Sequence, residues 1–345
     1  MKRNKVLILL IIFISVNCTQ NSNFKRELIQ ANGMPDVDQD FSFMHFINVD
    51  EGYLFGTLSI WSDTSNEQIE NSNKKNHFTE EANIYKTTDG GKNWIKIDSI
   101  NNCSYSKNAT YYDGSIYIYL KNSIKNYTNS LLRFKIADSS ITVLKYNFER
   151  IGEIWINENK ICIIYTNNDI SKILVTNRDL KKIDSICIDK SFRSNILSVM
   201  NQSVVLTYYN QLYNITKNRR INFTDSLFSY ITVKNNSEIL ILVHKNNNIN
   251  ILAVNIITNK LKRIGRIPGY HIVYDLQSNN KIITCFVGNM EGFFNCYDLL
   301  YSVDEGKTWK IRKLTESSYV FPSCLIDNIL YIYSGGARIQ KIILE

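Results

Sequence analysis

Residues that could bind a metal ion or act in catalysis are few in this sequence and widely spaced. The four histidines are His45, His77, His244 and His271. Neither His-x-x-x-His nor His-x-Glu spacing, which would suggest a metal site, is found among them. No two cysteines have Cys-x-x-Cys spacing, and no Gly-rich phosphate loop is found. The sequence therefore predicts no metal site and no cofactor.

Two aspartates lie in nearly identical surroundings. Thr87 to Trp94 reads Thr-Thr-Asp-Gly-Gly-Lys-Asn-Trp, and Ser302 to Trp309 reads Ser-Val-Asp-Glu-Gly-Lys-Thr-Trp. Both copies fit Ser/Thr-x-Asp-x-Gly-x-Thr/Asn-Trp, with strand-like residues on either side. Asp89 and Asp304 are therefore expected to accept N–H groups within a hairpin turn, which is a structural role rather than a catalytic one.

The other residues of the motif are expected to be structural for the same reason. Gly91 and Gly306 supply a backbone φ that a Cβ would oppose, and Thr87 and Ser302 begin the two turns. Trp94 and Trp309 follow the turns, and we expect them to pack between neighbouring sheets.

Both copies resemble the Asp-box (BNR) repeats of β-propellers, a superfamily that includes sialidases and photosystem II assembly-factor-like propellers. Met44 to Gly56, followed by Ile84 to Gly91, is similar to the blade consensus of the second group. The resemblance covers about two blades and implies the fold. It also implies that the turns lie away from any ligand site.

The resemblance raises a sialidase-like glycoside hydrolase as the alternative function. In that family an Arg cluster holds the substrate carboxylate, a Tyr activated by Glu is the nucleophile, and an Asp is the acid/base. In that family the first Arg lies in a Phe/Tyr-Arg-Ile-Pro motif ahead of the first blade, and Phe41 to Asp50 contains no such motif. The sequence has one Arg-Ile-Pro, Arg266 to Pro268, and its position fits a turn between two blades. No catalytic residue is assigned, and paired carboxylates of another glycosidase stay open.

A repeating unit of four strands can be followed from Phe43 to the end of the chain. The most hydrophobic strand of each unit recurs roughly every 35 to 50 residues after a longer first interval. These strands are Gly52 to Gly56, Ser115 to Leu120, Lys160 to Tyr165, Ser203 to Tyr209, Glu238 to His244, Lys281 to Gly288 and Ile329 to Gly335. Abundant Ile, Tyr and Phe with only 3 prolines also favour β structure.

We therefore expect an all-β protein, a single β-propeller over residues 24–345 with about seven four-stranded blades, six or eight being the alternatives. The last unit is one strand short. Phe24 to Gln30 would complete it, because an open strand edge invites aggregation. The ring would then be closed by the N- and C-terminal strands.

The first residues resemble a bacterial lipoprotein leader. Lys2, Arg3 and Lys5 precede an apolar run of about eleven residues, which is too short to span a bilayer. Cys18 follows the run. We expect residues 1–17 to be a signal peptide, Cys18 to be lipidated and residues 18–23 to tether the domain to the bacterial cell envelope; simple secretion is the alternative.

The formal net charge of +8 falls to about +5 without the leader, and the lysines are scattered. This argues against a nucleic-acid partner. Cys285 and Cys296 lie almost symmetrically about Gly288 to Gly292, so a cross-strand disulfide between them is one alternative. Two buried free thiols are the interpretation that we prefer.

Function is expected on the loops between second and third strands, because long loops on a rigid scaffold often carry function. The candidate binding face comprises Trp61, Tyr127 and His244. We expect a monomeric, non-catalytic scaffold that binds a protein or a glycan. This expectation depends on the fold and on the lack of a catalytic set.

Overall fold

The computed structural model describes residues 26–34, 39–61, 78–122 and 129–345. Within the last range the gaps are 149, 158–159, 168–169, 178, 180, 188–195, 201–202, 209–210, 215–218, 223–226, 234–236, 246–247, 271, 280, 292–293, 315–321 and 336. The predicted signal peptide, Cys18, its tether and Tyr127 lie outside the described residues. Among the elements that are described, none is a helix of the length and hydropathy needed to cross a bilayer.

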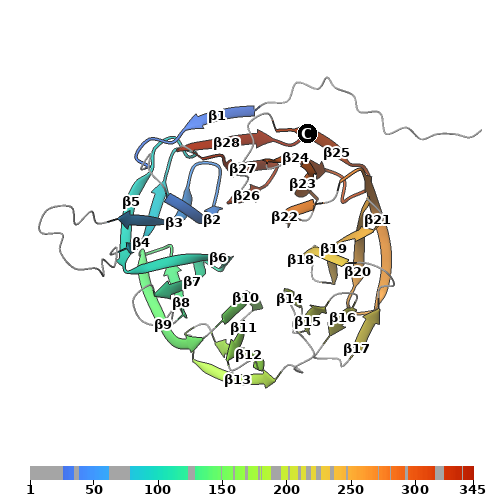
Figure 1. Ribbon diagram of the computed structural model, residues 1–345, viewed down its shortest axis with the longest axis horizontal. Coiled ribbons are helices and arrows are strands. Elements are labelled where there is room, and N and C mark those ends of the chain that lie inside the picture. The colour runs from blue at the N-terminus through green and yellow to red at the C-terminus, as the bar shows by residue number, and fades with distance from the viewer. Residues whose placement is uncertain are drawn as a thin grey trace, which may run out of the picture.

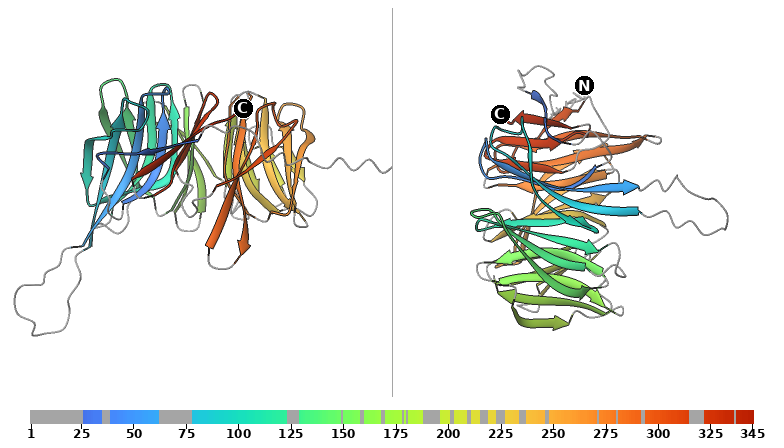
Figure 2. Two further views of the ribbon diagram at one scale, coloured as in Figure 1. Left: turned by 90° about the horizontal axis from the view of Figure 1, so that it is seen from above. Right: turned by 90° about the vertical axis from the view of Figure 1, so that its left-hand side faces the viewer.

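The described residues form seven four-stranded antiparallel sheets, which stand around a central axis (Figure 1). Seen from the side, the molecule is a disc, and the strands run across its thickness (Figure 2). This arrangement confirms the predicted all-β propeller. Sheets 1 to 6 take strands β2 to β25 in consecutive groups of four, and sheet 7 combines β26, β27, β28 and β1.

Each sheet has an inner strand next to the axis, a second strand, a third strand and an outer strand. The inner strands are β2 (Gln39–Phe46), β6 (Cys103–Tyr112), β10 (Arg150–Asn157), β14 (Ile196–Met200), β18 (Leu227–Val233), β22 (Ile272–Ser278) and β26 (Ser323–Ile326). The second strands are β3 (Gly52–Trp61), β7 (Ser115–Asn122), β11 (Lys160–Asn167), β15 (Ser203–Tyr208), β19 (Glu238–Lys245), β23 (Ile283–Glu291) and β27 (Ile329–Tyr333).

The third strands are β4 (Phe78–Thr87), β8 (Asn129–Lys135), β12 (Ile170–Asn177), β16 (Gln211–Asn214), β20 (Asn248–Asn255), β24 (Phe294–Ser302) and β28 (Arg338–Ile343). The outer strands are β5 (Ile95–Asn101), β9 (Ser140–Phe148), β13 (Lys182–Cys187), β17 (Arg219–Asn222), β21 (Lys260–Pro268), β25 (Lys310–Lys313) and β1 (Arg26–Gln30).

Burial decreases from the second strand to the rim. The first six residues of β7 are all buried, whereas no residue of the outer strand β5 is. A second strand is covered on both faces by neighbouring sheets, and therefore its sequence is a continuous hydrophobic run. The core is accordingly a ring of layers between sheets; at the seam of sheets 7 and 1, for example, the rings of Phe46 and Tyr331 stack 3.9 Å apart.

The two ends of the chain meet in sheet 7. β1 pairs antiparallel with β28, from Arg26 opposite Ile342 to Gln30 opposite Arg338. The N-terminal strand therefore covers the edge that β28 would otherwise expose. Beyond β1, Asn32 pairs with sheet 1: its carbonyl accepts the N–H of Trp94, and its own N–H donates to Lys92.

Of the two alternatives for Cys285 and Cys296, the cross-strand disulfide is wrong. Cys285 is a buried free thiol. In the β23–β24 ladder it lies opposite Leu300, while Cys296 lies opposite Asn289. The β23–β24 hairpin reverses direction after Glu291, so its centre lies two residues later than the symmetry of the two cysteines suggested. Each residue of offset along a strand adds about 3.3 Å, so the two Cα atoms lie well beyond the roughly 7 Å limit for a disulfide.

Candidate binding site in the axial cavity

A cavity of about 350 Å³ lies beside the axis, where four sheets meet. Its walls come from the inner strands β2, β6, β22 and β26 of sheets 1, 2, 6 and 7. The lining residues are Phe41, Ser42, Phe43, Met44, His45, Ala109, Asp275, Gln277, Pro322, Ser323, Cys324 and Leu325. A cavity of this size lies within the range of small-molecule sites.

Most inner strands carry a bulge that interrupts the ladder to the second strand. The register shifts lie between Phe41 and Phe43, Tyr105 and Ala109, Ile151 and Ile154, Phe228 and Tyr230, and Tyr274 and Gln277. A bulge leaves a residue out of the pairing and turns its side chain in a new direction. The bulges of β2 and β22 place Ser42 and Asp275 at the cavity wall.

Asp275 is one of two residues, with Leu276, in the bulge of β22, and it has an unusual conformation. Its φ is +47°, in the left-handed region that costs an L-residue about 1 kcal/mol or more. The hydroxyl of Ser323 donates to Oδ2, and Nε2 of Gln277 donates to the same oxygen at 2.7 Å. Desolvation raises the pKa of Asp275 to about 6, and these two hydrogen bonds only partly oppose the rise.

Gln277 joins sheets 6 and 7 across the cavity wall. Its Nε2 donates to the carbonyl oxygen of Ser323 at 3.1 Å and to the Ser323 hydroxyl at 2.6 Å, while its Oε1 accepts the N–H of Leu325 at 2.8 Å. One amide side chain therefore satisfies polar groups of two inner strands and fixes the position of Asp275.

Aromatic rings form part of the wall that β2 contributes. The His45 ring stacks on the Tyr111 ring with 4.0 Å between centroids. The Phe43 ring lies almost parallel to the His45 ring, with 6.2 Å between their centroids. Burial lowers the pKa of His45 to about 4, so the ring is neutral near pH 7. His45, predicted only as an isolated histidine, is thus part of an aromatic wall of the cavity.

The first turn motif forms the hydrogen bonds expected of it. Thr87 Oγ1 and the N–H of Asn93 each donate to Asp89 Oδ1 at 2.9 Å, and Asn93 Nδ2 donates to Oδ2 at 2.6 Å. Gly91, at φ +92°, donates its N–H to Thr87 Oγ1 at 3.0 Å. The hydrogen bonds that Asp89 itself accepts, the one from the Asn93 N–H foremost, hold its pKa below the ordinary value. Both carboxylate oxygens of Asp89 are therefore occupied by the turn.

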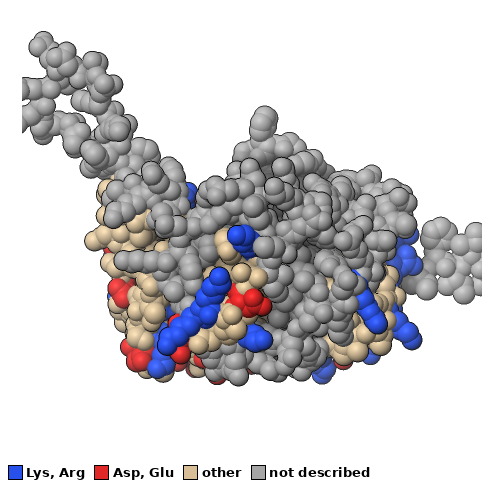
Figure 3. All heavy atoms as spheres, turned by 90° about the horizontal axis from the view of Figure 1, so that it is seen from below, with Lys and Arg blue, Asp and Glu red and all other residues tan. Residues whose placement is uncertain are grey.

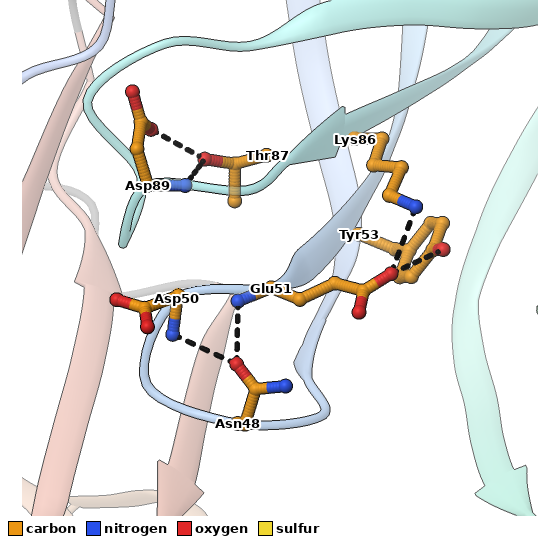
Figure 4. A network of polar contacts seen from close by, with 7 residues as sticks. All are labelled: Asn48, Asp50, Glu51, Tyr53, Lys86, Thr87 and Asp89. Carbon is orange, nitrogen blue, oxygen red and sulfur yellow. Dashed lines mark hydrogen bonds and ion pairs between the residues drawn. The ribbon is translucent and has the colours of Figure 1, made fainter.

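The neighbouring β2–β3 turn supports this motif (Figure 4). The carbonyl of Asp50 accepts the N–H of Gly90 at 2.8 Å. Asn48 Oδ1 accepts the N–H groups of Asp50 and Glu51, and Glu51 forms an ion pair with Lys86 at 2.8 Å. The carboxylates of Glu51 and Asp89 in Figure 4 thus have partners within the two turns.

The second turn motif repeats this geometry. Ser302 Oγ and the N–H of Thr308 each donate to Asp304 Oδ1 at 2.8 Å, and Thr308 Oγ1 donates to Oδ2 at 2.7 Å. Gly306 has φ +85°, and its N–H donates to Ser302 Oγ at 2.8 Å. Desolvation acts to raise the pKa of Asp304, but the hydrogen bonds from Thr308, Ser302 and Lys307 together outweigh it and lower the pKa.

The indole N–H of each tryptophan donates a hydrogen bond to its own turn, and the ring packs on a neighbouring sheet. Trp94 Nε1 donates to the Gly91 carbonyl at 2.9 Å, and Trp94 lies in the core between sheets 1 and 7. Trp309 Nε1 donates to the Gly306 carbonyl at 3.0 Å, and Trp309 packs against β21 of sheet 5, where a Cβ on Gly265 would lie 2.5 Å from it. Both tryptophans therefore pack between neighbouring sheets.

The predicted binding face is not brought together with the cavity. Trp61 is the last residue of β3, opposite Phe78, and His244 lies near the end of β19, opposite Leu227 and Ile249. Both positions are at the second-to-third-strand end of their sheets, but sheets 1 and 5 stand on different sides of the ring (Figure 1).

The sequence analysis missed Asp275. The only signal was local: Ile272 to Ser278 reads Ile-Val-Tyr-Asp-Leu-Gln-Ser, in which Asp and Gln interrupt an otherwise apolar strand. An acidic residue within an inner strand is a useful signal, because a buried carboxylate is costly unless it is paired or functional.

No family model matches the chain, and no curated protein matches it either. Similar solved structures are found by shape. An oligogalacturonate lyase from Vibrio parahaemolyticus has a TM-score of 0.61 at 10% identity, covering 93% of this chain and 97% of that one. A chain of the Mitotic Checkpoint Complex has a TM-score of 0.60 at 10% identity and covers 99% of both chains.

An acylaminoacyl peptidase from Pyrococcus horikoshii is also similar, with a TM-score of 0.56 at 11% identity over 86% of this chain. This chain spans only 49% of that peptidase chain. At such low identity, these likenesses show the fold alone.

Proposed function

We propose that this protein is a β-propeller binding module of the bacterial cell envelope, and that its ligand binds in the axial cavity. The observation that carries the proposal is Asp275, which combines a left-handed backbone with a desolvated carboxyl group at the cavity wall. Both features cost stability, and such costs are typical of functional sites.

Binding is favoured over glycoside hydrolysis by the cavity lining. A glycosidase of the usual kind needs two carboxyl groups about 5 to 9.5 Å apart. Among the lining residues that the structure describes, Asp275 is the one carboxylate, and none is an arginine that could hold a sialic acid. The hydrolase alternative therefore has no support from the described cavity.

The lyase likeness raises the question of a metal site. A second similar structure is described as an oligogalacturonate lyase in complex with manganese. In the part of this chain that the structure describes, no group of three or more His, Cys, Asp or Glu residues could hold a metal ion.

A protein partner is the second candidate. The β3–β4 and β23–β24 hairpins project from the same side of the disc (Figure 2). β3 continues past Leu58, where its pairing with β2 ends, and β23 continues past Gly288, where its pairing with β22 ends. Projecting strand edges can add an extended peptide as a further strand.

The membrane attachment is part of the proposal and depends on the leader sequence. A lipidated Cys18 would carry more than one acyl chain, which is enough for stable anchoring. Figure 3 shows Lys and Arg beside Asp and Glu on the described part of one face, so this part offers no uniformly basic surface to a nucleic acid.

The experiment is native mass spectrometry of the full chain in detergent after incubation with the small-molecule fraction of a bacterial envelope extract. Ala109→Phe would fill the cavity from sheet 2, and Val143→Phe, at an exposed site on β9, is the matched control. We expect a bound small molecule on the wild type and on Val143→Phe, and none on Ala109→Phe. A ligand retained by Ala109→Phe, or no ligand on the wild type, would contradict cavity binding.

A further inference from the structure

The geometry points to a ligand with a positively charged nitrogen, an ammonium or guanidinium group, which binds to the carboxylate of Asp275 in the axial cavity. This inference rests on the proposed function and names the chemical class of its ligand. A charged amino sugar and the Lys or Arg side chain of a partner protein share this chemistry.

The charges of the cavity favour a cation. None of the described lining residues is a lysine or an arginine, and His45 is neutral near pH 7 because burial lowers its pKa. Ion pairs elsewhere, such as Lys86 with Glu51, use other carboxylates. An ionised Asp275 is therefore a desolvated negative charge without a basic lining residue, which is unfavourable until a cation binds.

The hydrogen bonds leave one oxygen of Asp275 for the ligand. Ser323 and Gln277 both donate to Oδ2. Among the described residues, no donor to Oδ1 is found. An ammonium or guanidinium group supplies several N–H donors, and a charge-assisted hydrogen bond is about twice as strong as a neutral one.

The aromatic wall suits an organic cation better than an anion. Phe43 and His45 both line the cavity, and the negative faces of aromatic rings attract cations. A phosphate or a uronic acid would instead meet the carboxylate and the same ring faces. The cavity therefore selects against the anionic sugars that a sialidase-like protein would bind.

Protonation of Asp275 should weaken binding at low pH. The titratable groups near it are His45 of β2, Cys285 of β23 and Cys324 of β26. Burial raises the pKa of the Cys324 thiol to about 12 and raises that of Cys285, so both thiols stay neutral. The pKa of Asp275 itself, raised to about 6, thus sets the pH range in which cation binding is lost.

The test compares probes that differ in charge. Isothermal titration at pH 7 with the full chain in detergent would use glucosamine, N-acetylglucosamine and N-acetyl-lysine amide. We expect at least one of the two cations to bind at least tenfold more tightly than neutral N-acetylglucosamine. Tighter binding of glucosamine would indicate a glycan source, and tighter binding of the lysine amide a protein source.

Two variants make the test specific. Asp275→Asn should lose at least tenfold in affinity for the cation. Asp327→Asn should not, although Asp327 also has a left-handed φ, +49°, because it is exposed in the β26–β27 turn.

Binding of neither cation, or full affinity in Asp275→Asn, would overturn the inference. If N-acetylglucosamine binds as tightly as the cations, and Ala109→Phe abolishes its binding, the inference fails while the proposed cavity function stands.

Discussion

The main-chain N–H of Trp94 donates a hydrogen bond of 2.8 Å to the carbonyl oxygen of Asn32, which joins the first turn motif to the segment that follows the N-terminal strand. The Asn93 side chain accepts a further hydrogen bond from Asn32 Nδ2 at 3.3 Å. The ring is therefore closed in two ways, by the pairing of β1 with β28 and by the contact of residues 31–34 with sheet 1. The turn motif thus supports the whole ring as well as its own hairpin.

Gly33 should tolerate no side chain. Its φ is +79°, and a Cβ there would lie 2.2 Å from the carbonyl oxygen of Trp94. Gly114 has a similar φ of +70°, but nothing lies within 4 Å of its Cβ position. Gly33→Ala should therefore reduce the free energy of unfolding by at least about 2 kcal/mol more than Gly114→Ala, whose cost is about 1 kcal/mol of backbone strain. Equal losses in urea unfolding would contradict the closure described above.

Truncation of Trp94 should strongly destabilise the fold. The side chain is 3% exposed and packs between sheets 1 and 7, so Trp94→Ala should cost about 3 to 5 kcal/mol. The adjacent Ile95 is 68% exposed, and Ile95→Ala should change stability by less than about 0.5 kcal/mol. Chemical denaturation of both variants measures the difference, and a small loss for Trp94→Ala would show that the indole is not packed.

Asp275 should make the folded protein less stable as pH rises. Its pKa is about 6 in the folded state and about 3.9 when unfolded, so the folded state binds the proton more tightly. The stability that this proton provides is present below pH 4 and is lost as pH rises through 6. The free energy of unfolding of Asp275→Asn, relative to that of the wild type, should therefore rise by on the order of 2 kcal/mol between pH 4 and pH 8. A constant difference across that range would refute the assignment.

Cys285 should react as a free thiol. The register of β23 and β24 separates it from Cys296 by several residues, so no bond between them forms in the native state. Alkylation in denaturant without a reductant, followed by peptide mass spectrometry, should modify Cys285 fully. A peptide pair linked through positions 285 and 296 would contradict the ladder register.

Attachment to the envelope should depend on Cys18. Cys18→Ala removes the thiol that would be lipidated, so the variant should move from the membrane fraction to the soluble fraction of the envelope. Unchanged membrane association of Cys18→Ala would rule out the lipid anchor.

The strands were largely predictable from the sequence. The second strands predicted to start at Gly52, Ser115, Lys160, Ser203 and Glu238 begin at those residues. Their hydrophobic runs are easily recognised, because neighbouring sheets bury both faces. The turn motifs were predictable for a different reason: each uses a side chain that bonds its own backbone, so the geometry is local.

The cavity was not predictable in the same way. Asp275, Gln277 and Ser323 come together only when sheets 6 and 7 pack side by side, and a bulge decides which way Asp275 points. Neither the packing of sheets nor a bulge is encoded by a short local pattern. The alternative of a disulfide between Cys285 and Cys296 fails for a similar reason, since a hairpin that reverses two residues later changes every cross-strand neighbour.

The most direct test of the account is an NMR titration of the Asp275 carboxyl carbon in the full chain labelled with ¹³C-aspartate, with the signal assigned by its loss in Asp275→Asn. A strained, desolvated carboxyl group at the cavity wall should titrate near pH 6. A midpoint near 4, the ordinary value of an exposed aspartate, would contradict the claim that this residue is held in a costly state in the axial cavity.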